Sequence, residues 1–142
     1  MHVTQVSVFL QNKPGHLEKV LKFLHEKSIN IITLTIAETS DYGILRLITN
    51  DPEEAVAVLK AHQVSCSTTR VLAIALDDTP GSLHLAVQTF SRCNLNIEYM
   101  YAFSEKRDGR AIMIFRFEDA DQARDVLVRE GFQVLSNMDV VE

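Results

Sequence analysis

The amino-acid sequence predicts an α+β fold built from two copies of one β-α-β-β-α-β unit. Two observations carry this prediction. A Pro-Gly turn occurs twice, at Pro14-Gly15 and at Pro80-Gly81, 66 positions apart. Each turn follows a β-rich run and opens a helical pattern of apolar residues. We therefore divide the 142-residue chain into repeats at residues 1–69 and 70–142.

The first repeat contains alternating strand and helix signals. A strand of about five to seven residues is predicted where apolar residues alternate, at Val6, Val8 and Leu10. After the turn, apolar residues follow the helical spacing i, i+3, i+4, i+7, at Leu17, Val20, Leu21 and Leu24. The β-branched run at 31–36 and the return at 44–49 predict a hairpin. Asp51 and Pro52 start a second helix, and 64–68 can form a short closing strand.

The second repeat follows the same plan. A strand is predicted at 71–76, and Leu83, Ala86, Val87 and Phe90 repeat the first helical stripe at the same offset of 66. After the hairpin signal at 106–109 the offset becomes 68, so that Asp119 matches Asp51. A two-residue insertion near the second hairpin explains this change, because loops absorb insertions at little cost. The last segment, 133–141, is predicted to be the closing strand.

This order of elements is the ferredoxin-like, split βαβ arrangement. A unit of about 70 residues has a small core and leaves sheet edges open. No Gly/Ser/Pro-rich spacer separates the repeats near Thr69. We therefore expect two ferredoxin-like units paired side by side into one antiparallel sheet, with the helices on one face.

Composition and charge exclude several classes of function. The formal net charge is −5 with scattered Lys and Arg, which argues against nucleic acid or an anionic membrane as partner. No apolar run reaches the roughly 18 residues of a membrane span, and the N-terminal residues lack the features of a signal peptide. Cys66 and Cys93 form no C-x-x-C motif. We expect a cytoplasmic protein.

The chain also lacks the usual signatures of catalysis. It has no G-x-S-x-G motif, P-loop or G-x-G-x-x-G motif, and no nucleophile lies near a base in a recognisable pattern. The five histidines form neither an i, i+4 nor an H-x-H pair. We expect no enzyme activity, no cofactor and no metal site.

The turn itself has chemistry that suits a ligand. A helix start leaves its first backbone N–H groups without intrahelical partners, and such donors suit a carboxylate. A single Pro-Gly pair is more often a plain turn, but two copies in matching contexts favour a site.

The repeated pattern [Asn/Asp]-x-Pro-Gly-x-Leu, a helix, and then Asn-Ile resembles the ACT domain, a family of small modules that bind amino acids and regulate amino-acid metabolism. The resemblance covers almost the whole chain as two tandem copies. It implies an effector site where two units meet, with the turn of one unit facing the second strand of its neighbour. The implied ligand-binding residues are Asn12, Gly15, His16, Leu17, Asn30 and Ile31 in the first repeat, and Asp78, Gly81, Ser82, Leu83, Asn96 and Ile97 in the second.

The two copies differ at important positions. Asp78 stands where the first repeat has Asn12, and an ionised aspartate would hold an ammonium but repel an α-carboxylate. Ser82 stands where the first repeat has His16. We therefore expect unequal sites, with the better amino-acid site at the first turn.

The leading hypothesis is a non-catalytic regulatory module that binds a free amino acid at the interface between the two ACT repeats. The alternative is a regulatory subunit of an amino-acid biosynthetic enzyme, similar to the small subunit of acetohydroxyacid synthase. An enzyme partner, if one exists, cannot be named from the sequence.

Tyr99, Tyr101 and Phe103 share one face of a predicted strand, where the first repeat has Thr33, Thr35 and Ala37. Helix-facing packing is one interpretation, and an outer sheet face that docks a second chain is the other. Because Ile32, Leu34 and Ile36 look like the better core face in the first repeat, we predict a homodimer. Light scattering at micromolar protein tests this, and a strictly monomeric mass would contradict it.

The resemblance also predicts how the two repeats share their sites. The Asn12 turn should be completed by Asn96, and the Asp78 turn by Asn30, because an Asn side chain both donates and accepts hydrogen bonds. We therefore expect Asn96→Ala to weaken ligand binding in calorimetry. Unchanged affinity at every site would contradict this pairing.

Overall fold

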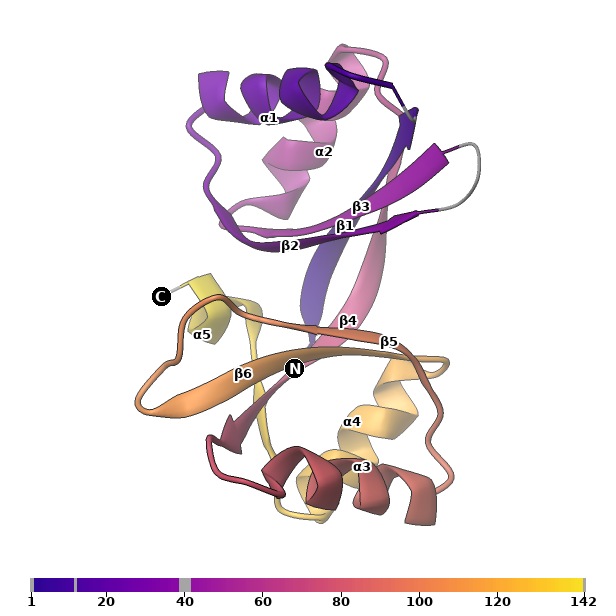
Figure 1. The fold of residues 1–142 in the computed structure, drawn as a ribbon, viewed down its shortest axis with the longest axis vertical. Coiled ribbons are helices and arrows are strands. Elements are labelled where there is room, and N and C mark those ends of the chain that lie inside the picture. Colours follow the sequence, from indigo (N-terminus) through magenta and orange to yellow (C-terminus); the bar gives the residue numbers. More distant parts are fainter. Residues whose placement is uncertain (1, 12, 39–41, 142) are drawn as a thin grey trace. The chain divides into compact units, whose positions relative to one another are not determined.

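The computed structural model describes residues 2–11, 13–38 and 42–141. These residues form seven strands and five helices, arranged in two compact units, Thr4–Thr69 and Arg70–Val140 (Figure 1). The described chain contains no helix that is long and apolar enough to cross a membrane. The described part also has no group of three His, Cys, Asp or Glu residues that could hold a metal ion.

The first unit has the order of elements that the sequence predicts. Its elements are β1 (Val3–Gln11), α1 (His16–Glu26), β2 (Ile31–Glu38), β3 (Tyr42–Thr49), α2 (Pro52–Ala61) and the start of β4 (Cys66–Asp77). The strands lie in the order β2-β3-β1-β4. Strands β1 and β2 both pair antiparallel with β3. The first strand therefore lies between the third strand and the closing strand, as in a ferredoxin-like unit.

The second unit repeats this arrangement. It continues β4 and adds α3 (Ser82–Arg92), β5 (Ile97–Ala102), β6 (Arg110–Phe117), α4 (Ala120–Arg129), β7 (Gln133–Leu135) and α5 (Asn137–Val141). Strand β4 pairs with β6 on one side and with β7 on the other, and β5 pairs with β6. The predicted α+β class with two ferredoxin-like units is confirmed.

The local geometry repeats at the offsets read from the sequence. Helices α1 and α3 begin 66 residues apart, at His16 and Ser82, whereas β3 and β6 begin 68 apart, at Tyr42 and Arg110. The two-residue insertion therefore lies before these strands. The strand register also shifts at equivalent places, between Ile31 and Thr33 in β2 and between Ile97 and Tyr99 in β5.

The ends of the four long helices are also equivalent between the units. Each is followed by a residue with φ between 56° and 89°, at Ser28, Gln63, Asn94 and Gly131. The next residue donates its N–H to a carbonyl in the last turn, as in the bond from Ile29 to Leu24 and the one from Leu95 to Phe90. This is the pattern of a Schellman C-cap, which satisfies carbonyls that the helix itself leaves unpaired.

Each unit has its own core between its helices and one face of its strands. In the first unit Val6, Val8, Leu45 and Leu47 pack against apolar residues of α1 and α2, such as Val20, Leu24 and Leu59. In the second, Phe90 lies among Phe115, Phe117 and Phe132, with ring centroids 5.2–5.6 Å from its own. These two cores fix the positions of the helix starts at which the candidate site lies.

Three strand predictions are wrong in extent. The predicted strands at 64–68 and 71–76 are replaced by one continuous strand, β4, which begins at Cys66, and β1 has nine residues instead of five to seven. The predicted closing strand 133–141 ends at Leu135 and continues as α5. Ser136 and Asp139 form a capping box, in which Asp139 Oδ2 accepts the Ser136 N–H at 2.9 Å and Ser136 Oγ accepts the Asp139 N–H at 3.3 Å.

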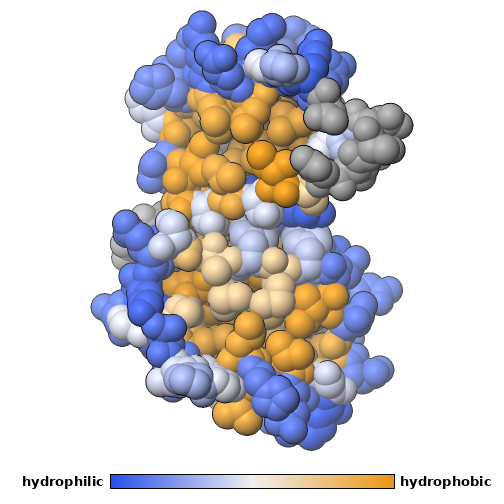
Figure 2. Space-filling view, viewed as in Figure 1, coloured by the Kyte–Doolittle hydropathy of each residue, from blue (hydrophilic) through white to orange (hydrophobic). Residues whose placement is uncertain are grey.

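The predicted core face of β2 is only half right. Leu34 and Ile36 pair with Leu47 and Leu45, so they share the face that carries the core. Both are nevertheless 44% exposed, because β2 is the outermost strand of its unit. Figure 2 shows hydrophobic residues reaching the surface of both units beside hydrophilic helix surfaces.

The stripe at Tyr99 and Tyr101 does not face the helices. In β5 it is Met100 that pairs with Phe115 and joins the core, whereas Tyr101 pairs with Ile114 on the opposite face. Both tyrosines are half-buried. The helix-facing interpretation is therefore wrong, and the homodimer stays a prediction.

Candidate functional site

The two Pro-Gly turns give α1 and α3 a start that differs from those of α2 and α4. Gly15 and Gly81 precede their helices with φ of 91° and 86°, and neither helix receives a side-chain cap. Helices α2 and α4 are instead capped by Asp51 and Asp119, whose carboxylates accept N–H groups of their first turns. The N–H groups at the starts of α1 and α3 are thus left without a side-chain cap and, apart from the Ser82 N–H, which donates to the Thr79 carbonyl at 3.2 Å, remain able to bind an anion.

A cavity of about 730 Å³ lies beside the first turn, and we call it the first-turn cavity. The end of β1, the turn, the inner side of α1 and the segment between α2 and β4 form its wall. Its lining residues are Phe9, Leu10, Gln11, Lys13, Pro14, Gly15, His16, Lys19, Phe23, Tyr42, His62, Gln63, Val64 and Ser65. All of them belong to the first unit.

The described lining of this cavity carries basic side chains and no carboxylate. Lys13 and Lys19 supply positive charge at the turn and at α1. His16 Nδ1 accepts the N–H of Gln11 at 2.7 Å, which fixes the imidazole against the end of β1. Since Nδ1 is the acceptor, a neutral His16 carries its proton on Nε2, which is then free to donate.

Aromatic rings form the apolar part of the same lining. Phe23 and His62 are stacked, with centroids 3.8 Å apart and planes 3° from parallel. Phe9 and Tyr42 meet edge to face at 6.5 Å. The cavity therefore combines anion-binding donors with a surface for an apolar group, which is the usual composition of a small-molecule site.

The second repeat has a smaller equivalent, which we call the second-turn cavity. It measures about 250 Å³ and is lined by Ala75, Leu76, Asp77, Ser82, Leu85, Ala86, Thr89, Arg110, Gly131 and Phe132. The repeat offsets place Leu85 where the first unit has Lys19, and Thr89 where it has Phe23. The second-turn cavity therefore lacks both the ammonium of Lys19 and the stacked ring of Phe23.

Acidic residues near the second turn are paired with cations. Asp78 forms an ion pair with Lys106. Asp77 Oδ1 lies 3.3 Å from Arg110 Nε. Both carboxylates are substantially exposed, so the pairs contribute little to stability. Both carboxylates are nevertheless already paired with a cation of the protein, including Asp78, which the sequence predicts as an ammonium ligand.

Only some of the predicted site residues line these cavities. Gly15 and His16 line the first-turn cavity, and Ser82 lines the second-turn cavity. Leu17 packs against the first core, and Ile31 and Ile97 pack against the first and second cores. Asn30 donates its N–H to Asn50 Oδ1 at 2.9 Å and accepts the Asn50 N–H at 3.1 Å. Asp78, Gly81, Leu83 and Asn96 are exposed, and Asn12 lies outside the described residues.

Several lining residues were missed by sequence reasoning. Lys19 and Phe23 follow the motif on α1, whereas Tyr42, His62 and Gln63 come from distant segments. The motif carries no information about distant segments. Two of these residues could have been predicted from the repeat itself. Lys19 stands where the second repeat has Leu85, and Phe23 stands where it has Thr89, so both positions differ in chemistry between the repeats.

Comparisons with known proteins agree with this geometry. The family model described as an ACT domain pair matches residues 1–142. A crystal structure of protein BT0572 from Bacteroides thetaiotaomicron is 34% identical with a TM-score of 0.93, over 100% of this chain and 97% of that one. No curated protein matches the chain.

More distant structures share the fold. The regulatory subunit of aspartate kinase from Thermus thermophilus, in a ligand-free form, is 17% identical with a TM-score of 0.62, over 92% of this chain and 93% of that one. The regulatory subunit of aspartate kinase from Thermus flavus is 16% identical with a TM-score of 0.60, over 89% and 90%.

These observations define the class of the protein as a regulatory ligand-binding module. The chain belongs to the ACT family and is an ACT domain pair.

The backbone of the first turn can be tested directly. Gly15→Ala places a Cβ at φ 91°, where it meets no heavy atom within 4 Å, so the cost is conformational and not steric crowding. We expect a loss of about 1–2 kcal/mol in the free energy of unfolding, measured by chemical denaturation. Gly81→Ala should cost a similar amount, and Gly15→Asn should cost less because Asn tolerates this region. A neutral Gly15→Ala would contradict the left-handed turn.

Proposed function

We propose that this chain is a non-catalytic regulatory module that binds a free amino acid in the first-turn cavity. The observation that carries the proposal is the uncapped start of α1 opening beside a cavity lined by Lys13 and Lys19. Backbone N–H groups at a helix start and ammonium groups both stabilise a carboxylate. Membership of the ACT family supports the same class of ligand, since the family resemblance implies amino-acid effectors.

The rest of the lining can complete the recognition of an amino acid. Gln63 donates its side-chain N–H to the Ala61 carbonyl at 3.2 Å, so its carbonyl oxygen remains an acceptor for an ammonium. Gln11 and Ser65 offer further polar groups. The Phe23–His62 stack supplies an apolar surface for the effector's side chain. Residues from the second repeat, above all Asn96, remain part of the hypothesis.

Regulation would follow from differential binding. A ligand shifts a conformational equilibrium only by the difference in its affinity for the two states. Here the ligand would stabilise the arrangement in which the turn, α1 and the start of β4 surround it. The downstream partner would be an enzyme that responds to this shift, or a second copy of the chain.

The proposal predicts a selective thermal shift. Among the twenty amino acids, we expect one or a few to raise the melting temperature. A ligand at 100 times its Kd adds roughly 2.7 kcal/mol to the stability. Lys19→Gln should weaken the binding of that ligand roughly tenfold, because a hydrogen bond from a charged donor contributes about 1.5 kcal/mol.

The matched control is Lys22→Gln. Lys22 lies on the same helix, is 67% exposed and pairs with Glu26 at 3.9 Å, away from the first-turn cavity. The Lys22→Gln substitution removes the same charge as Lys19→Gln and should leave the affinity for the amino acid unchanged. If both variants bind equally well, or if no amino acid shifts the melting temperature, the proposed function is wrong.

A further inference from the structure

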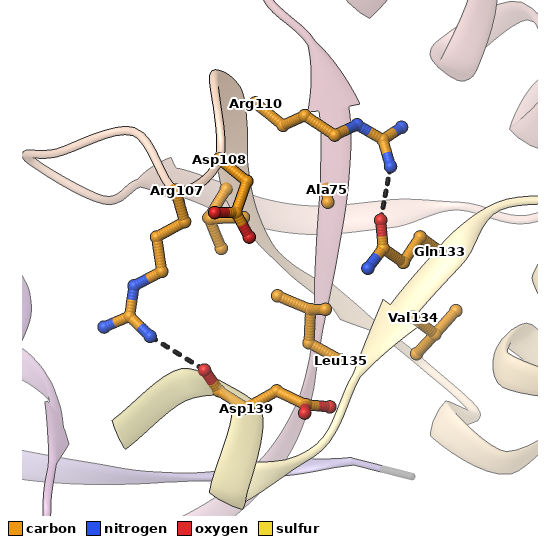
Figure 3. Close-up of a pocket in the computed structure, with 9 residues that line it drawn as sticks. Ala75, Arg107, Asp108, Arg110, Gln133, Val134, Leu135 and Asp139 are labelled. Carbon is orange, nitrogen blue, oxygen red and sulfur yellow. Dashed lines mark hydrogen bonds between the residues drawn. The ribbon is translucent and has the colours of Figure 1, made fainter. Parts of the chain in front are cut away.

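A third cavity, of about 470 Å³, lies in the second unit beside the hairpin that joins β5 to β6 (Figure 3). We call it the hairpin cavity. Its floor is apolar and buried: Ala75 and Ile112 are each 3% exposed, and Val134 and Leu135 are 8% and 7% exposed. It is separate from the first-turn cavity in its lining residues, and the family motif does not contain its polar groups.

One side of this cavity presents donors. Arg110 donates from Nη1 to Gln133 Oε1, and Asp77 Oδ1 lies 3.3 Å from its Nε. The hydrogen bond to Gln133 orients the guanidinium, whose buried Nε makes no hydrogen bond, and its second terminal nitrogen is left for a ligand. Because Gln133 uses its oxygen on Arg110, its amide nitrogen is left as a donor, and Figure 3 shows this nitrogen on the cavity side.

The opposite side presents a carboxylate. Asp108 stands in the hairpin turn, and Figure 3 shows its carboxylate pointing into the cavity. The other acid, Asp139, is already engaged. It accepts the N–H of Ser136 and then the hydroxyl of Ser136, both at 2.9 Å, and these hydrogen bonds lower the pKa of its carboxyl group.

Arg107 closes the same side without being free for a ligand. Its Nη1 donates to the Asp139 carbonyl at 2.7 Å, and its guanidinium lies over the Phe103 ring at 5.4 Å. It therefore positions α5 at the rim of the cavity and balances part of the negative charge there.

We propose that the hairpin cavity binds a zwitterionic α-amino carboxylate, whose carboxylate contacts Arg110 and Gln133 and whose ammonium contacts Asp108. A donor pair on one side and one carboxylate on the other match opposite charges on a small molecule. A simple anion would face the carboxylates of Asp108 and Asp139, and a simple cation would face Arg107 and Arg110. The buried apolar floor between them suits an aliphatic side chain.

This polar set belongs to the second repeat alone. The repeat offset places Tyr42 where the second unit has Arg110, and Ser65 where it has Gln133. The hairpin cavity is therefore a second site, additional to the one proposed at the first turn, and it can be occupied whether or not the first-turn cavity binds a ligand.

Backbone amide NMR of the full chain tests the proposal and separates the two sites. Each of the twenty protein amino acids is added at about millimolar concentration, and shifts are followed for residues 107–112 and 133–139 and for residues 9–19 and 62–65. We expect at least one amino acid to shift the first group of resonances. Its amide, which lacks the carboxylate, and its des-amino acid, which lacks the ammonium, should each bind at least tenfold more weakly.

The key variant is Asp108→Asn. Asp108 has a φ of 53°, a conformation that Asn also tolerates, so the turn should be preserved while the charge is removed. We expect roughly tenfold weaker binding at the hairpin cavity. Asp125→Asn removes the same charge from a side chain on α4 that is 72% exposed, and should leave the affinity unchanged. Arg110 is not used, because it also lines the second-turn cavity.

Three results would overturn the proposal. One is that no amino acid shifts residues 107–112 or 133–139. Another is that shifts are confined to residues 9–19 and 62–65, which would support the proposed function and reject this second site. The third is equal binding by Asp108→Asn and Asp125→Asn in proteins whose amide spectra show an intact fold.

Discussion

The geometry of the candidate site depends on how α1 and α3 begin. A helix leaves its first N–H groups without internal partners, and α2 and α4 satisfy one of theirs with an aspartate cap. At α1 and α3 the preceding residue is a glycine with φ near 90°, which has no side chain to accept these donors. Each turn therefore leaves the first N–H groups of its helix without a side-chain cap, beside the cavity next to that turn. In the first unit this is a cavity with lysines and aromatic rings.

Equivalent backbones carry different side chains in the two repeats, and the difference in the cavities follows from that. The turns, the register shifts in β2 and β5 and the helix ends all agree at their offsets. Between the first-turn and second-turn cavities, however, a lysine becomes Leu85 and a phenylalanine becomes Thr89. The two repeats thus share one backbone frame, whereas their side chains make the second-turn cavity smaller and the first-turn cavity basic and aromatic. The hairpin cavity takes Ala75, Arg110 and Gln133 from the positions of Phe9, Tyr42 and Ser65 in the first repeat, and it adds Arg107 and Asp108 from the second hairpin, which contains the two-residue insertion.

Sequence reasoning was most successful where a pattern has a local cause. Pro-Gly, the helical stripes and the Asp51 and Asp119 caps each act within a few residues, so the helices and the two-unit plan were predicted closely. It failed for α5, although Ser136 and Asp139 form a capping box that the sequence displays. The apolar residues around Val134 favoured a strand that continued to residue 141, and the helix cap at Ser136 was therefore not predicted. It also expected Leu34 and Ile36 to be buried, because periodicity gives the face of a strand but not its place in the sheet.

By itself, the sequence determined the repeat, the fold class, the turn and the family, because these rest on local backbone preferences and on spacing. Only the tertiary structure decided which residues surround each turn. His62, Gln63 and Ser65 reach the first turn because α2 ends and β4 begins beside it. Likewise, Asp108 and Gln133 line the same hairpin cavity because β7, which begins at Gln133, pairs with β4. Which residues line a cavity depends on the packing of segments that are distant in the sequence, and the spacing of residues along the chain does not reveal it.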